Sequence, residues 1–333
     1  MAPTSDQVAG QARLPAVAGV DVGGTKILGI VYAGEGIRPT DALAEHRVPT
    51  PTGTEALLDA LVGVVSRLRA DGARSGVELA AVGFGVPGLV DRNGTLRFAP
   101  NLPGVEEIPI GDELRARVGL PVVVENDATC AAWAEHVLGA ARVDDALLVT
   151  LGTGIGAGIV AGSVLQGGVN GFAGEAGHMV VDPTGPPCPC GRRGCWERYA
   201  SGSALGRLGR DAAQAGRASQ VVILAGGDPE DVRGEHVVQA ARSGDHQALQ
   251  IVREFAGWFA LGLANLVNLL DPEVAVIGGG LAEAADVFIE PIRNAYLDVV
   301  YAAEHRPPLR IEVAVVGESA GALGAALLAR GSI

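Results

Sequence analysis

The chain has 333 residues, and 48% of them are apolar, which is enough to build two cores of ordinary size. Its 49 glycines exclude a plain helical bundle and favour an α/β protein with many tight turns. The formal net charge of −13 argues against a nucleic-acid surface, although backbone amides in a glycine-rich turn can still hold a phosphate.

The amino-terminal part of the chain begins with a polar segment and continues into a hairpin. Residues 1–16 have neither the basic start nor the apolar run of a secretory signal, so we expect a disordered tail and a cytoplasmic protein. Residues 20–33, VDVGGTKILGIVYA, predict a strand, a glycine-rich turn and a second strand. Lys26, at the end of this turn, is the single lysine beside 24 arginines, which indicates that a compact ammonium group is needed there.

Alternating helices and strands follow. Residues 54–70 have apolar side chains at helical spacing, with Thr54 or Thr52 as the expected cap. Residues 79–86 and 121–124 predict short strands, and residues 128–138 predict a helix behind the second of them.

A second hairpin repeats the first one 129 positions later. Residues 149–162, VTLGTGIGAGIVAG, align without gaps with residues 20–33 and share the strand, turn and strand pattern. This repetition predicts a duplicated two-domain α/β fold with one phosphate-holding turn in each domain. The alternative is that both segments are ordinary hairpins of a glycine-rich protein.

The carboxy-terminal part continues the alternation. The apolar stretch 251–270 has an uncharged part of only 16 residues, which suits a buried helix and not a membrane span. Residues 273–277 and 310–316 predict buried strands, and residues 319–329 predict a helix rich in small residues. We expect a small domain over 17–127, a large domain over 128–316, and a final helix, about 317–333, that packs back on the small domain.

The glycine-rich turns suit phosphate but match neither common nucleotide motif. The chain has no Gly-Lys dipeptide and therefore no Walker A loop. The run Gly152 to Ala157 matches a dinucleotide-binding pattern, but it continues as a strand where that motif requires a helix. We therefore expect the two turns to face each other and bind the β- and γ-phosphates, with Asp21 holding Mg²⁺ through water and the glycines after residue 277 against a nucleoside. The residues of this nucleotide site are Asp21, Gly23, Gly24, Thr25, Lys26, Gly152, Thr153, Gly154, Gly278, Gly279 and Gly280.

A cluster of metal-binding residue types follows the second hairpin. His178 precedes the run CPCGRRGC, which supplies Cys188, Cys190 and Cys195. Three thiolates and an imidazole satisfy tetrahedral zinc, and a site closed by four protein ligands is structural. A disulfide is the weaker interpretation in a cytoplasmic chain, and a redox pair would more often be C-x-x-C.

Polar side chains near this cluster suggest a polyol ligand. Glu175 lies three residues before His178, and Glu197 lies two residues after Cys195. The ring nitrogen of His178 that does not bind zinc remains able to donate to a hydroxyl group. At the junction of the two domains, Asn126 can bind a hydroxyl and Asp127 can accept the proton of an attacking one.

Together these motifs resemble the ROK family of repressors and sugar kinases, in particular its glucose-phosphorylating members, from about residue 17 to 330. The resemblance rests on DVGGTK, GFGVPG, FAPNLPG, ENDA, LGTGIGAGIV, GEAGH, CPCGRRGCWE and VAVIGGG. It implies the two-domain actin-like ATPase (ribonuclease H-like) fold with an interdomain active-site cleft, ATP with Mg²⁺ as donor, and a homodimer or homotetramer. It also implies Asp127 as catalytic base, zinc on the four residues above, and sugar contacts from Gly88, Asn101, Asn126, Glu175, His178 and Glu197.

The expected activity is transfer of the terminal phosphate of ATP to the 6-hydroxyl of glucose. One alternative is a kinase for fructose, mannose, allose or an N-acetylhexosamine, and polyphosphate is an alternative donor. A sugar-responsive DNA-binding repressor is the rival from another class. It is disfavoured because only about 16 residues precede the first strand and the chain is acidic.

Overall fold

The computed structural model describes residues 14–34 and 37–333. These residues form two compact units, one of residues up to Cys130 together with 321–333, and one of residues 131–320. The expected tail, residues 1–16, lies outside the described residues except for 14–16, which begin the first strand.

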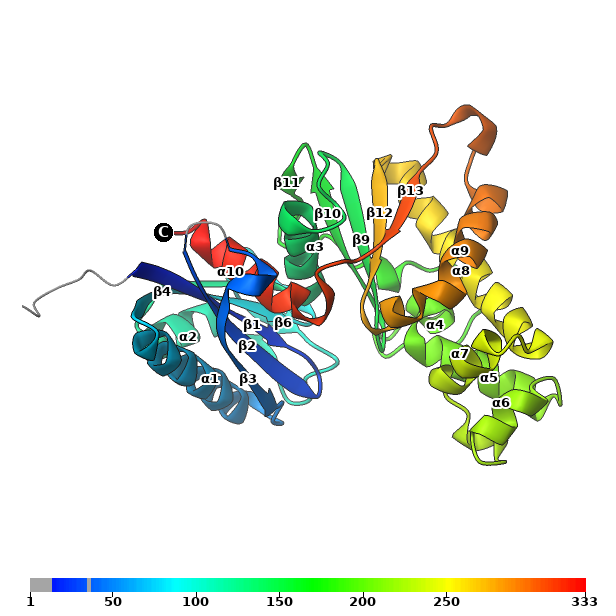
Figure 1. Ribbon diagram of the computed structural model, residues 1–333, viewed down its shortest axis with the longest axis horizontal. Coiled ribbons are helices and arrows are strands. Elements are labelled where there is room, and N and C mark those ends of the chain that lie inside the picture. Colours follow the sequence, from blue (N-terminus) through cyan, green and yellow to red (C-terminus); the bar gives the residue numbers. More distant parts are fainter. Residues whose placement is uncertain (1–13, 35–36) are drawn as a thin grey trace, which may run out of the picture. The chain divides into compact units, whose positions relative to one another are not determined.

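The first unit contains a five-stranded sheet of order β3-β2-β1-β4-β8 and a three-stranded sheet of order β5-β6-β7 (Figure 1). The β1–β2 and β2–β3 pairs are antiparallel, whereas β1–β4 and β4–β8 are parallel. Its elements are β1 (Leu14–Val22), β2 (Lys26–Ala33), β3 (Ala42–Pro49), α1 (Thr54–Arg74), β4 (Val77–Val86), β5 (Leu89–Val90), β6 (Leu96–Phe98), β7 (Glu106–Ile108), α2 (Ile110–Val118), β8 (Val122–Asn126), the start of α3 (Asp127–Leu138) and nearly all of α10 (Ala320–Arg330).

The second unit contains a sheet of order β11-β10-β9-β12-β13, in which β10 is antiparallel to β9 and β11, and β12 is parallel to β9 and β13. The apolar core lies between this sheet and the helices. Its elements are the rest of α3, β9 (Ala146–Leu151), β10 (Ile155–Ala161), β11 (Val164–Leu165), α4 (Glu197–Ala200), α5 (Gly202–Gln214), α6 (Ser219–Leu224), α7 (Gly234–Arg242), α8 (His246–Leu270), β12 (Val274–Gly278), α9 (Ala285–Val299) and β13 (Arg310–Val313).

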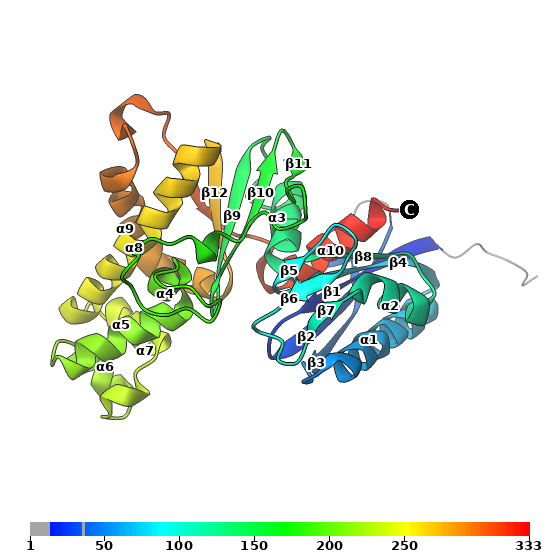
Figure 2. The same cartoon turned by 180° about the vertical axis from the view of Figure 1, so that it is seen from behind.

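Helices cover both faces of the five-stranded sheet in the first unit (Figure 2). Helix α1 packs over Gly29 of β2, where an added Cβ would lie 2.4 Å from a methyl group of Val64. Helix α10 packs on the opposite face. Gly19 of β1 pairs with Gly83 of β4, and Gly19 is the neighbour of Val20, the residue that pairs with Gly29. Because successive residues of a strand point to opposite faces, Gly19 and Gly83 face away from α1. Each of these two strand glycines has a backbone carbonyl of α10 within 2 Å of the position of a Cβ.

The sequence-based expectations for these elements are largely confirmed. The α/β class and both hairpins are confirmed, with turns between Val22 and Lys26 and between Leu151 and Ile155. The expected cap of α1 is wrong: the N-cap is Gly53, with a φ of 90° that favours glycine, and Thr54 donates to a neighbouring loop. No helix within 14–34 and 37–333 has the length and apolar character that a bilayer crossing requires.

Candidate functional site

The first glycine-rich turn joins β1 to β2 and is held from both sides. The backbone nitrogen of Gly23 donates to the carbonyl of Lys26 at 2.8 Å. Thr50, after β3, donates its hydroxyl to the carbonyl of Gly23 at 2.7 Å and its backbone nitrogen to the carbonyl of Thr25 at 3.0 Å. The side of the turn formed by Gly24, Thr25 and Lys26 is exposed, so the sequence builds an ordered turn that presents its backbone to solvent.

Asp127 is the first residue of α3, directly after β8. One carboxylate oxygen accepts a hydrogen bond from the backbone nitrogen of Ala128 at 2.8 Å, and burial raises the pKa of this group. Asp21 is the next-to-last residue of β1 and lies near Asp127, with Gly85 of β4 between them. A Cβ on Gly85 would lie 3.4 Å from the Cα of Asp127 and 3.5 Å from Oδ1 of Asp21. Three neighbouring strand ends therefore bring the expected base and the expected magnesium-binding carboxylate to one place.

Three expected sugar contacts also lie in the first unit. The side-chain amide of Asn126 donates to the carbonyl of Gly88 at 3.2 Å, and its oxygen accepts from the backbone nitrogen of Thr129 at 3.0 Å. Gly88 has a φ of 102°, and a Cβ there would lie 2.2 Å from the carbonyl oxygen of Phe98, so the position requires glycine. Asn101 lies beside the first glycine-rich turn, because its carbonyl oxygen is 3.2 Å from the position of a Cβ on Gly24.

The Cys₃His cluster forms in the second unit. One ligand atom from each of His178, Cys188, Cys190 and Cys195 lies within 4.8 Å of the other three. The backbone permits this because Gly191 and Gly194 have φ values of 85° and 69°. A donor set of three sulfurs and one imidazole nitrogen at these separations fits a tetrahedral metal ion. These are the four residues that the spacing in the sequence predicts.

The acidic side chains lie on both sides of His178. Its Nδ1 faces the cysteines, 3.8 Å from the sulfur of Cys188, whereas its Nε2 lies 3.9 Å from a carboxylate oxygen of Glu175. A carboxylate oxygen of Glu197 lies 3.8 Å from Nδ1 and accepts from the Cys188 thiol at 3.1 Å. Nε2 of His178, which faces away from the cysteines, can therefore bind one hydroxyl group together with the carboxylate of Glu175.

Glu197 is positioned by an anchor that the sequence analysis missed. Trp196, directly before it, is fully buried and donates its indole N–H to the carbonyl of Trp258 at 2.9 Å. The indole occupies the space above Gly262 of α8, where a Cβ would lie 2.1 Å from the ring. The available signal was a large aromatic residue between a metal ligand and an acid.

The second glycine-rich turn joins β9 to β10 and leads into a cavity of about 840 Å³. Gly152 and Thr153 line this cavity. The carbonyl of Gly152 accepts from the backbone nitrogen of Gly202, and Gly154 contacts the other carboxylate oxygen of Glu197, 2.4 Å from the position of a Cβ. The turn thus contacts the start of α5 on one side and Glu197 on the other.

The three glycines at the end of β12 and directly after it have different positions. Gly280 lines the cavity, Gly278 is buried in β12, and Gly279, with a φ of 80°, packs against the backbone of Leu151.

Sequence reasoning missed the start of α5, although Ser201 before an apolar helical pattern is a recognisable N-cap. It also missed the basic side chains of the cavity, Arg210, Arg233 and Arg242.

The ROK family profile matches residues 17–332. The chain belongs to the ROK family. It is 44% identical over 316 residues to the glucokinase of Streptomyces coelicolor, covering 94% of this chain and 96% of that protein. It is 30% identical over 307 residues to the xylose repressor of Bacillus subtilis, covering 92% of this chain and 74% of the repressor.

A solved structure of this family has the same fold. The ROK family glucokinase of Streptomyces griseus, crystallised with glucose and AMPPNP, superposes with a TM-score of 0.83 at 41% identity, covering 95% of this chain and 99% of that one. The predicted actin-like ATPase class is therefore confirmed at the level of fold. The relatives of this chain include both a glucokinase and a xylose repressor, so membership of the family does not by itself decide between the two activities.

Proposed function

We propose that this ROK protein is a sugar kinase that transfers the γ-phosphate of ATP to the 6-hydroxyl of D-glucose, giving ADP and glucose 6-phosphate. The observation that carries the proposal is its 41% identity, over 95% of the chain, to a kinase crystallised with glucose and an ATP analogue. The 44% identity to the Streptomyces coelicolor glucokinase over nearly the full length of both chains supports the same activity.

The sugar hydroxyls would be bound by side chains already in contact with one another. Glu175 and the Nε2 of His178 offer an acceptor and a donor 3.9 Å apart, which suits one hydroxyl between them. Glu197, fixed by the buried Trp196, offers a second acceptor. In the first unit, Asn101, Asn126 and the Gly88 loop would bind the remaining hydroxyls.

Asp127 would act as the general base. The sugar O6 attacks the γ-phosphorus, the bond from that phosphorus to the β–γ bridging oxygen breaks, and the hydroxyl proton passes to the carboxylate. Burial raises the pKa of Asp127, so its carboxylate is a better proton acceptor than an ordinary exposed aspartate.

The nucleotide would be held by both glycine-rich turns and by the cavity that begins at Gly152. Backbone amides and the hydroxyls of Thr25 and Thr153 would bind phosphate oxygens, and Lys26 adds the positive charge. Asp21 would hold Mg²⁺ through water, and the metal supplies charge neutralisation on the transferred phosphate. The nucleoside would lie against Gly280 in the cavity.

Zinc is the metal that the Cys₃His donors favour, and the site uses four protein ligands, as structural zinc sites do. Its role would be to fix the loop that carries His178 and Glu197. The proposal includes a cytoplasmic location, where reduced thiols persist, and a homodimer or homotetramer, which sedimentation analysis would measure.

A coupled assay across a panel of hexoses, with ATP and polyphosphate in parallel, tests this function. We expect the highest kcat/KM for glucose with ATP. Higher kcat/KM for another hexose would reassign the substrate, and absence of turnover with every sugar and donor would overturn the kinase. A reproducible footprint on operator DNA at physiological salt would instead favour the regulator.

A further inference from the structure

The small sheet β5-β6-β7 carries two of the proposed sugar contacts. Gly88 directly precedes β5, and Asn101 lies in the loop between β6 and β7. Both strand pairs are antiparallel and short, with two register pairs each. Pairing this limited leaves much of the positioning of the loop to side chains.

Asp91 closes the turn from β5 to β6. It is only 9% exposed, and its Oδ1 accepts hydrogen bonds from the backbone nitrogens of Asn93 and Thr95, both at 2.9 Å. These hydrogen bonds, led by that from Thr95, lower the pKa of Asp91, opposed by burial and helped by Arg97. The turn therefore holds a nearly buried carboxylate in its ionised form.

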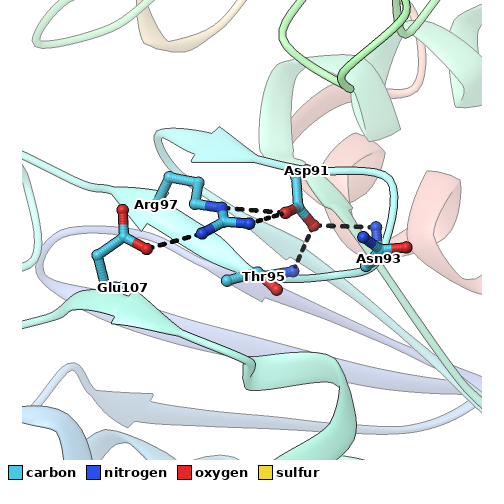
Figure 3. Close-up of polar contacts among 5 residues, drawn as sticks. All are labelled: Asp91, Asn93, Thr95, Arg97 and Glu107. Atoms are coloured by element: carbon cyan, nitrogen blue, oxygen red, sulfur yellow. Dashed lines mark hydrogen bonds and ion pairs between the residues drawn. The ribbon is translucent and has the colours of Figure 1, made fainter.

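Arg97 of β6 connects this carboxylate to the third strand (Figure 3). Its Nε and Nη2 donate to Oδ2 of Asp91 at 3.0 and 2.7 Å, and its Nη1 donates to Glu107 of β7 at 2.8 Å. Glu107 has a φ of 51°, a left-handed conformation that costs a non-glycine residue about 1 kcal/mol or more. The contact with Arg97 offsets part of this cost. Through Asp91 and Glu107, the guanidinium of Arg97 links the turn from β5 to β6 with β7.

The loop 99–105, between β6 and β7, is thereby fixed at both ends. Ala99, Leu102 and Val105 are buried and point into the core, whereas Asn101 is exposed beside the phosphate turn. The backbone nitrogen of Leu102 donates to the carbonyl of Ala99 at 2.9 Å. A shift between β6 and β7 would move Asn101 directly.

We infer that Arg97, held between Asp91 and Glu107, is a positioning residue for glucose binding that sets the place of Asn101 and of the Gly88 loop. The inference rests on the proposed function. Arg97 acts through the loop and the sheet, and a planar guanidinium is required because one group must contact two carboxylates, one in the turn from β5 to β6 and one on β7.

Steady-state kinetics of Arg97→Gln and Asp91→Asn test the inference. Asp91→Asn retains an oxygen for the turn amides and removes the ion pair. We expect KM for glucose to rise about tenfold in both variants, the effect of losing hydrogen bonds to a charged group. Because the phosphate turns are untouched, kcat and KM for ATP should stay within about twofold. Arg97→Lys should recover part of the loss, since an ammonium can contact one of the two acids.

The control is Arg74→Gln, which removes an ion pair with Asp71 on an exposed part of α1 in the same unit. It should leave every kinetic constant unchanged. Two results would overturn the inference alone, provided that the wild type is active. One is an unchanged KM for glucose in both Arg97→Gln and Asp91→Asn, and the other is an equal rise in KM for glucose and for ATP in these variants. A wild type that turned over no sugar would overturn the proposed function, and the inference with it.

Discussion

Asp127 combines two properties that oppose each other, because burial favours its protonated form and catalysis by a base needs the ionised one. Activity should therefore fall as the pH drops through its raised pKa. Asp127→Asn keeps the size and the acceptor for Ala128, and we expect kcat to fall by about 10²- to 10⁴-fold. Glucose binding, measured by calorimetry, should weaken far less.

The same substitution has a predicted effect on stability. A carboxyl whose pKa is raised in the folded state contributes stability at low pH that is lost as the pH rises through that pKa. The Asn variant should therefore have a larger free energy of unfolding than the wild type at neutral pH, and the difference should vanish in acid.

For activity, near-normal turnover of Asp127→Asn with a raised KM for glucose would make Asp127 a binding residue and not the base. Glu175 would then be the best remaining candidate for the base.

Gly152 and Gly154 offer a matched pair of substitutions in the second turn. A Cβ on Gly152 would meet no described atom within 4 Å beyond its chain neighbours, whereas a Cβ on Gly154 would lie 2.4 Å from Glu197. If phosphate approaches the turn closely, Gly152→Ala should raise KM for ATP with unchanged thermal stability. Gly154→Ala should raise KM for glucose by displacing Glu197. Wild-type KM for ATP in Gly152→Ala would contradict close approach of phosphate to this residue.

At the scale of single residues, sequence spacing was informative where ligands are close in the chain. The cysteine run and His178 span 18 positions, and one small loop brings them together. Contacts between distant residues carried no such signal. Gly154 and Glu197 touch across 43 positions, and Trp196 fits over Gly262 across 66, so both depend on tertiary packing that no local pattern encodes.

At the scale of elements, the loop from His178 to Glu197 has little regular structure of its own. It contains two isolated β-bridge pairs, and a short helix starts at its end, at Glu197. We expect about one zinc per chain, and Cys190→Ala should lose the metal, the loop's anchor and affinity for glucose together. Elemental analysis checks this, and zinc retained in the variant would contradict the proposed ligand set.

Long elements were predictable and short ones were not. The β1–β2 and β9–β10 hairpins have apolar strands of six to nine residues around a glycine-rich turn, and runs of this length are long enough to predict strands from the sequence. Strands β5, β6 and β7 have two or three residues each, too few to establish alternation. The hydrogen bonds that Arg97 makes to Asp91 and Glu107 join parts of this sheet that are 6 and 10 residues away, and sequence pattern does not reveal them.

At the scale of the whole molecule, the two units have the same strand order and the same sequence of antiparallel and parallel pairs. The offset of 129 residues holds for the ends of β1 and β9 and the starts of β2 and β10. The internal repeat in the sequence is therefore a repeat of topology. The units differ after their third strand, where one has α1 and the other has the cysteine loop and helices α4 to α8.

Helix α10 lies far in sequence from the other elements of the first unit but packs on their sheet, and Gly83→Ala tests how much this packing contributes. The new Cβ would lie 1.9 Å from the carbonyl oxygen of Ala325, so α10 must move, at an expected cost of about 1–3 kcal/mol. Gly63→Ala on α1 is the matched control, because its Cβ would meet no described atom within 4 Å outside its own helix, and it should stabilise by about 0.5–1 kcal/mol. Urea unfolding measures both changes, and hydrogen exchange should show lost protection in β1, β4 and α10 of the Gly83 variant only. Equal stability of the two variants would mean that α10 adapts without cost, and its close packing would then contribute little to the unit.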